Sequence, residues 1–196
     1  MAYLRIAEAR AAGAAVRSRV QKSATRILSE TARGFTSTTK YDVFLSHSYQ
    51  DADVILGVKS IIESLGLTVY VDWIDDNGLD RSAVTVKTAE ILRVRMRASS
   101  CLVYAHSENA SDSDWMPWEL GYFDGFKPMF VWILPLVVNY DSEFKGQEYL
   151  GLYPTVDKLA SIPGRLNLGF DDVGEQRSSI PLAKAAKGQG VFLKAT

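Results

Sequence analysis

A tryptophan and a glutamate in the second half of the chain have the spacing of a small chemical site. Trp115 and Glu119 are four residues apart, so they share one face of any helix that already includes Trp115. Ser113 or Asp114 can cap such a helix, and Pro117 is tolerated in its first turn. That face pairs a flat stacking surface with a carboxylate. The structural alternative is that Glu119 favours the positive helix N-terminus and the tryptophans belong to the core.

Motifs that indicate other enzyme classes are absent from the sequence. It has no Gly-x-x-x-x-Gly-Lys-Ser/Thr loop, no Gly-x-Gly-x-x-Gly after its first expected strand and no Gly-x-Ser-x-Gly elbow. His106 and Glu108 have the spacing of zinc deaminases, but the Pro-Cys-x-x-Cys partner is missing. One cysteine, Cys101, and two histidines cannot build a Cys/His zinc site, although they leave a carboxylate-bound metal open.

From residue 40 onward the apolar pattern predicts strands that alternate with helices. Strands are expected at 41–46, 67–73, 100–105 and 129–138, and helices at 52–65, 82–97 and 115–126. Asp51 can cap the first of these helices. Strands separated by helix-length segments imply right-handed crossovers and a parallel sheet. The expected fold class is therefore α/β with a flavodoxin-like sheet, whose ligands lie at the carboxyl ends of the strands.

The chain ends are less regular than this central region. Residues 1–33 carry seven basic and two acidic side chains, and their apolar spacing predicts one long helix. A helix that docks on its own domain or pairs with another copy is favoured over a membrane-surface helix, whose apolar face would be mostly alanine, and over a transit peptide. The predicted organisation is a helical extension at 1–33, a linker at 34–39, a domain at 40–160 and a C-terminal extension of uncertain structure at 161–196.

The overall composition of the chain limits the classes of partner that it can bind. The net charge of −1 gives no general attraction to nucleic acid or to anionic membranes. No apolar stretch approaches the roughly 20 residues that span a bilayer, and the first thirty residues lack a secretory signal. The single cysteine indicates a reducing compartment. We expect a soluble, cytoplasmic protein that binds neither nucleic acid nor membrane.

Two motifs resemble those of TIR domains. The segment 41–51, Tyr-Asp-Val-Phe-Leu-Ser-His-Ser-Tyr-Gln-Asp, is similar to the opening strand of the family. Trp115, Glu119 and Leu120 match its Trp-x-x-x-Glu-Leu motif at the same place in the strand order. The resemblance covers residues 40–155 and is greatest to bacterial TIR proteins of anti-phage defence, such as the TIR subunit of Thoeris systems.

The resemblance implies an activity. Such proteins cleave the nicotinamide–ribose bond of NAD+, and many rejoin the ADP-ribose into a cyclic signalling nucleotide. NAD+ is then the substrate, and no cofactor is expected. Expected partners are further copies, bound through TIR–TIR contacts, and a separately encoded effector that senses the product.

The resemblance also assigns residues. Glu119 falls on the catalytic position of the family, and the expected substrate-binding residues are Phe44, Ser46, His47, Asp72, Trp73 and Trp115. The loop 75–81 would complete the site, often by reaching a neighbouring subunit. It lacks the proline common in relatives, which leaves its conformation open.

The chemistry agrees with this assignment. The nicotinamide is cationic and leaves neutral, so the reaction needs no general acid and no metal. A carboxylate stabilises the positive charge that develops on the ribose, and an aromatic ring can stack on the nicotinamide for roughly 0.5–2 kcal/mol. Two alternatives use the same fold: a TIR module that only scaffolds assemblies, and a nucleoside deoxyribosyltransferase.

Overall fold

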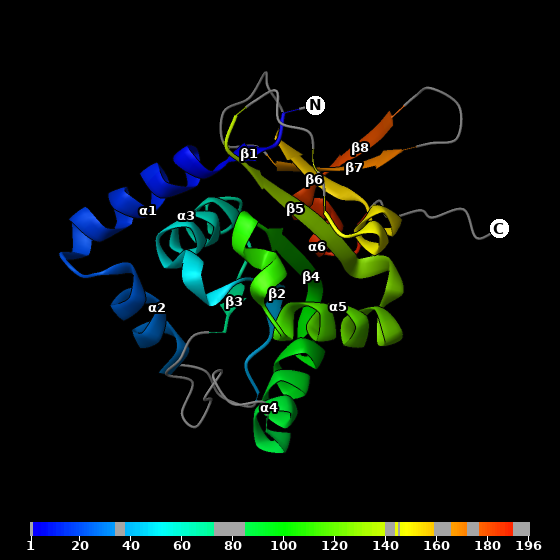
Figure 1. Cartoon of the computed structure of the whole chain (residues 1–196), viewed down its shortest axis with the longest axis horizontal. Coiled ribbons are helices and arrows are strands. Elements are labelled where there is room, and N and C mark those ends of the chain that lie inside the picture. The colour runs from blue at the N-terminus through cyan, green and yellow to red at the C-terminus, as the bar shows by residue number, and fades with distance from the viewer. Residues whose placement is uncertain are drawn as a thin grey trace.

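The computed structural model has a mostly parallel sheet with helices on both faces (Figure 1). The structure describes residues 2–33, 38–72, 85–139, 144, 146–158, 166–171 and 177–189. In these ranges the strands run in the order β3-β2-β4-β5-β6-β7-β8, and β1 pairs with β5. Neighbours from β3 to β6 are parallel, and the β6–β7 and β7–β8 pairs are antiparallel. The expected α/β, flavodoxin-like class is confirmed.

The elements have the following bounds. The strands are β1 Leu4–Arg5, β2 Tyr41–Ser46, β3 Val69–Val71, β4 Ser99–His106, β5 Val131–Val137, β6 Thr155–Lys158, β7 Leu166–Asp171 and β8 Arg177–Pro181. The α-helices are α1 Ile6–Val20, α2 Ala24–Arg33, α3 Ala52–Glu63, α4 Val86–Arg97, α5 Trp115–Phe126 and α6 Leu182–Ala186. Short 3-10 helices are η1 Tyr49–Asp51, η2 Glu108–Asp112, η3 Pro128–Phe130 and η4 Glu148–Leu152.

The central strands separate two cores. In β2, Val43 and Leu45 pack on the side of α3, whereas Phe44 packs with α4 and α5 on the opposite face. All seven residues of β5 are buried, which is the pattern of a parallel strand covered on both faces. Because side chains alternate along a strand, Ser46 is placed on the same face as Phe44, toward α5.

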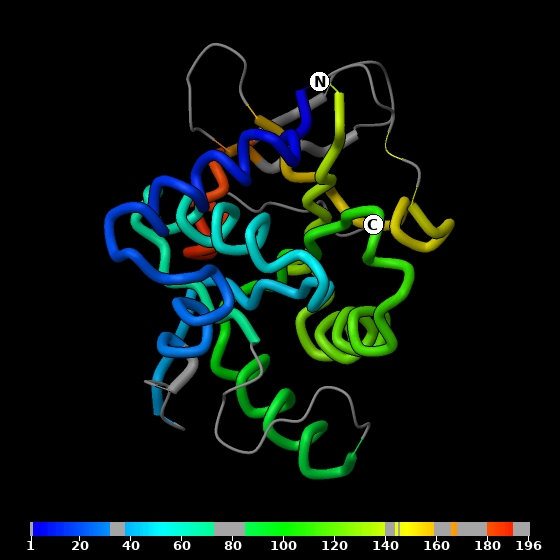
Figure 2. Tube along the Cα trace, turned by 60° about the vertical axis from the view of Figure 1, so that its left-hand side comes forward, coloured from blue at the N-terminus to red at the C-terminus, as the bar shows by residue number. Residues whose placement is uncertain are grey.

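The N-terminal segment docks on this domain, but one long helix was the wrong prediction. Gln21, in the left-handed conformation with φ of 52°, ends α1, and the Ser23 hydroxyl accepts a hydrogen bond from the Arg26 N–H at the start of α2. β1 pairs with the end of β5, with Leu4 opposite Leu136. Figure 2 shows α1 running alongside α3.

Small residues allow α1 and α3 to cross closely. A Cβ on Gly57 would lie 1.7 Å from the Ala9 carbonyl oxygen, and one on Gly13 would lie 2.5 Å from the Asp53 carbonyl oxygen. The ion pair Arg17–Asp53, at 2.7 Å, flanks this crossing. The backbones therefore touch where neither glycine has a side chain.

No element could be predicted for residues 161–196, and the structure places β7, β8 and α6 there. Leu166, Leu182, Ala185 and Ala186 are buried in the core on the α3 side. Among the described residues, no helix has the length and apolar character needed to cross a bilayer.

We expect Gly57→Ala to lower the free energy of unfolding by about 1–3 kcal/mol, because the new methyl group meets helix backbone that cannot move aside cheaply. The matched control is Gly121→Ala in α5, where a Cβ meets nothing within 4 Å. That change should raise stability by about 0.5–1 kcal/mol. Urea denaturation measures both, and an unchanged midpoint for Gly57→Ala would contradict the close crossing.

Candidate functional site

Helix α5 carries Glu119 to the carboxyl end of β2. The helix begins at Trp115, where the Ser113 hydroxyl accepts a hydrogen bond from the Met116 N–H at 3.3 Å. Asp114 makes no side-chain cap bond. Glu119 lies one turn further along and has no exposed surface. Because α5 includes Trp115, the predicted helical face shared by Trp115 and Glu119 is present.

A buried hydrogen bond joins Glu119 to the sheet. The Ser46 hydroxyl at the end of β2 donates to Glu119 Oε2 at 2.6 Å, and Ser46 is 1% exposed. Burying a carboxylate is costly unless it is hydrogen-bonded, so this contact offsets part of the cost and fixes the direction of the carboxylate. Of the predicted site residues, Ser46 and Glu119 are thus in direct contact.

Aromatic rings surround this pair. Phe44 is fully buried and stacks on Tyr70 with ring centroids 5.3 Å apart. Trp115 is buried in the same core cluster and meets Trp118 edge-on at 5.4 Å. The Arg93 guanidinium lies 5.4 Å from the Trp118 ring centroid, which joins α4 to the outer side of α5. Phe44 and Trp115 are therefore packed core residues on the α5 side of the sheet.

Tyr104 on β4 is electrostatically coupled to Glu119. Burial raises the pKa of the Tyr104 phenol well above its ordinary value, and Tyr149 and the Glu119 carboxylate raise the pKa further. The phenol consequently stays protonated at neutral pH. Tyr104 carried no signal in the sequence beyond membership of a buried strand.

The loop after β2 is held by a buried carboxylate. Asp51 makes no cap bond to α3, contrary to prediction. Its carboxylate instead accepts hydrogen bonds from Ser107 Oγ at 2.5 Å and from Asn109 Nδ2 at 2.7 Å. His47, which is 1% exposed, has its Nδ1 2.8 Å from the Leu45 carbonyl oxygen. These contacts fix the ends of β2 and β4 side by side.

Two predicted residues remain, Asp72 and Trp73. Asp72 directly follows β3 and is 1% exposed, next to the strand that carries Ser46. Trp73 and the loop 75–81 lie outside the residues that the structure describes.

A cavity of about 560 Å³ lies at the carboxyl ends of β4 and β5. His106, the last residue of β4, lines it and stacks on Tyr104 with ring centroids 6.3 Å apart. Among the residues that the structure describes, none of the predicted site residues lines this cavity. Burial lowers the pKa of His106, against the opposing effect of Gln147, so the imidazole is neutral at pH 7.

Comparison with known proteins decides the family. The chain is 54% identical over 138 residues to a Bacillus cereus (strain MSX-D12) protein named "Probable 3' cyclic ADP-D-ribose synthase ThsB'". The aligned residues make up 70% of this chain and 71% of the relative. The chain belongs to the Thoeris-type TIR family. The recognition from two motifs is thereby confirmed.

A second relative supports the assignment over a shorter stretch. "Putative cyclic ADP-D-ribose synthase TIR2" of Cytobacillus dafuensis is 36% identical over 83 residues, which are 42% of this TIR protein and 22% of the relative. No protein-family model matches the chain.

Ser46→Ala should lower the free energy of unfolding by about 1–3 kcal/mol, because it removes a donor from a buried carboxylate. Adding Glu119→Met to that variant should recover part of the loss, since position 119 then carries no carboxylate that needs a donor. Denaturant unfolding of the single and double variants gives the coupling. Strictly additive losses would show that the two side chains do not stabilise each other.

The pKa of His106 predicts a pH effect on stability. In the unfolded chain the imidazole has its ordinary pKa of 6.5, and the folded value is lower. As the pH falls below about 6.5, the unfolded chain takes up a proton that the folded chain resists, so stability declines. In His106→Gln the unfolding midpoint should fall less between pH 7.5 and 5.5. Equal pH slopes for the two proteins would contradict the assignment.

Proposed function

We propose that this TIR protein cleaves the nicotinamide–ribose bond of NAD+ and closes the ADP-ribose into a cyclic signal of anti-phage defence, with Glu119 as the catalytic carboxylate. The observation that carries the proposal is the Glu119 carboxylate itself. It is held by Ser46 at the carboxyl end of β2, in a chain 54% identical to a protein named as a cyclic ADP-D-ribose synthase. Ligands of flavodoxin-like sheets bind at this edge.

The proposed reaction proceeds in two steps. The bond between the ribose anomeric carbon and the nicotinamide nitrogen breaks, its electron pair leaves with the neutral nicotinamide, and positive charge develops on the ribose. The Glu119 carboxylate stabilises that charge, and Trp115 and Phe44 flank the nicotinamide. In the second step the 3'-hydroxyl oxygen, the position named for the Bacillus cereus relative, attacks the anomeric carbon and releases its proton to Glu119. Neither step calls for a metal or cofactor.

The burial of Glu119 affects how the activity is regulated. Glu119 has no exposed surface and Trp115 is 6% exposed, so NAD+ can reach the carboxylate only after neighbouring groups move. We infer low basal activity and a trigger supplied by infection. Self-association through TIR–TIR contacts would supply the rearrangement, and a separately encoded effector would sense the product. His47 and Asp72 border the same edge, where we place them as substrate-binding residues together with Ser46 and Trp73. The expected location is the cytoplasm.

A second candidate is a non-catalytic TIR scaffold. The same burial favours it, because a glutamate satisfied by a serine inside an aromatic core also fits a purely structural role. The two candidates differ in one respect: only the enzyme requires the carboxylate for turnover.

Glu119→Gln should reduce nicotinamide release from NAD+ by at least about 100-fold, because the amide cannot stabilise the developing positive charge. The matched control is Glu90→Gln on the exposed face of α4, which should keep wild-type turnover. Nicotinamide is measured by chromatography at high protein concentration, with and without lysate of infected cells. Circular dichroism checks that both variants fold.

Release by Glu119→Gln at the wild-type rate would contradict the catalytic role. If the wild type releases no nicotinamide under any of these conditions, the scaffold becomes the better description.

A further inference from the structure

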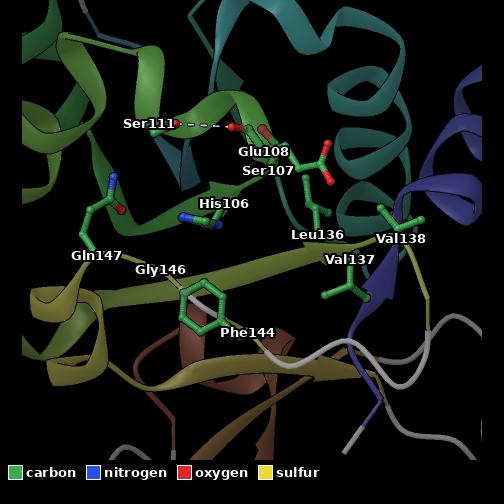
Figure 3. Close-up of a pocket in the computed structure, with 10 residues that line it drawn as sticks. All are labelled: His106, Ser107, Glu108, Ser111, Leu136, Val137, Val138, Phe144, Gly146 and Gln147. Carbon is green, nitrogen blue, oxygen red and sulfur yellow. Dashed lines mark hydrogen bonds between the residues drawn. The ribbon is translucent and has the colours of Figure 1, made fainter.

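The cavity at the ends of β4 and β5 has two unlike sides. Figure 3 shows His106, Gln147 and Phe144 gathered on one side and the apolar Leu136 and Val137 on the other. The Phe144 ring meets the His106 ring edge-on, with centroids 5.0 Å apart. A volume of about 560 Å³ lies in the range of small-molecule sites and exceeds what a few water molecules need.

The polar side offers hydrogen bonds that suit a heteroaromatic base. The Gln147 side chain hydrogen-bonds to the His106 imidazole and so occupies one of its nitrogens. Among the described residues, the Gln147 amide oxygen is buried without a hydrogen-bond partner and can accept from a base. The Phe144 ring adds a flat apolar surface beside them. A planar ring with both donor and acceptor edges would satisfy these groups together, and it would stack on an aromatic face.

The lining residues that the structure describes offer no cation to hold a phosphate group. None of the ten lining residues that the structure describes is Lys or Arg. Glu108 is exposed at the rim, and among the described residues its carboxylate makes no hydrogen bond or ion pair. The Ser111 hydroxyl lies close by and donates to the Glu108 carbonyl oxygen at 3.4 Å. The Glu108 carboxylate can accept hydrogen bonds from the vicinal hydroxyls of a sugar, and it repels an anion.

We propose that this cavity binds a nucleoside group, with the base against Phe144, His106 and Gln147 and the sugar hydroxyls on Glu108. Of the predicted substrate-binding residues that the structure describes, none lines this cavity, and neither does Glu119. The link between the two is Tyr104, which stacks on His106 and is electrostatically coupled to Glu119. Two sources supply this chemistry: the adenosine half of NAD+ as it first binds, which rests on the proposed function and requires the sugar to leave Glu108 before its 3'-hydroxyl attacks, and a free nucleoside that acts as a regulator.

The first test is adenosine binding to the full chain by titration calorimetry, without NAD+. Glu108→Gln and Gln147→Leu should each weaken adenosine binding by about tenfold, the effect of one lost hydrogen bond of ordinary strength. The matched control is Glu148→Gln, an exposed neighbour that does not line the cavity. AMP should bind more weakly than adenosine. Adenosine that fails to bind at millimolar concentration, or that binds all variants equally, overturns the proposal.

A second measurement identifies the source of the nucleoside. If the cavity takes the adenosine half of NAD+, adenosine inhibits NAD+ cleavage competitively, and Gln147→Leu raises KM with kcat unchanged. If the ligand is a regulator, adenosine changes kcat and does not compete. A chain that binds adenosine in the cavity but never cleaves NAD+ would refute the proposed function and leave the nucleoside site standing.

Discussion

The hydrogen bond between Ser46 and Glu119 is the contact on which the site depends. A carboxylate with no exposed surface must be satisfied inside the protein, and Ser46 supplies a donor from the end of β2. This fixes α5 against the sheet at the place where β2 lies between β3 and β4, the point at which a doubly wound sheet presents its ligand site. The aromatic residues Phe44 and Trp115 belong to the core cluster on the α5 side of the sheet, the face that also carries the buried Ser46–Glu119 pair.

Because the same residues belong to the core and to the proposed site, the surroundings of Glu119 are closed to solvent. Residues that would hold the nicotinamide are also core residues, and opening the site exposes apolar surface that the resting fold buries. A defence enzyme that consumes NAD+ benefits from this free-energy cost of opening, because the enzyme stays inactive until a new contact stabilises the open arrangement. The Tyr104 ring stacks on His106, which lines the neighbouring cavity, and Glu119 adds to the effects of burial and Tyr149 that raise the Tyr104 pKa.

Much of this architecture could be predicted from local sequence. The bounds 41–46 and 115–126 were correct because a short, mostly apolar run and a capped helical segment each specify one element. Ser46 and Glu119 were both named, but their mutual bond was not, since nothing local links residues 73 apart. The same holds for Asp51, whose partners are 56 and 58 residues away. The helix break at Gln21 uses a left-handed residue that is not glycine, and β1 is too short to show a pattern.

The most direct test of the central claim is the identity of the product formed from NAD+ in water enriched in oxygen-18. Ring closure by a hydroxyl of the substrate predicts a co-product with the mass of ADP-ribose less one water and without the heavy isotope. This product should be absent when Glu119 is replaced by Gln. A wild-type product consisting only of linear ADP-ribose that carries oxygen-18 would contradict cyclisation, and cleavage that persists without Glu119 would contradict the site.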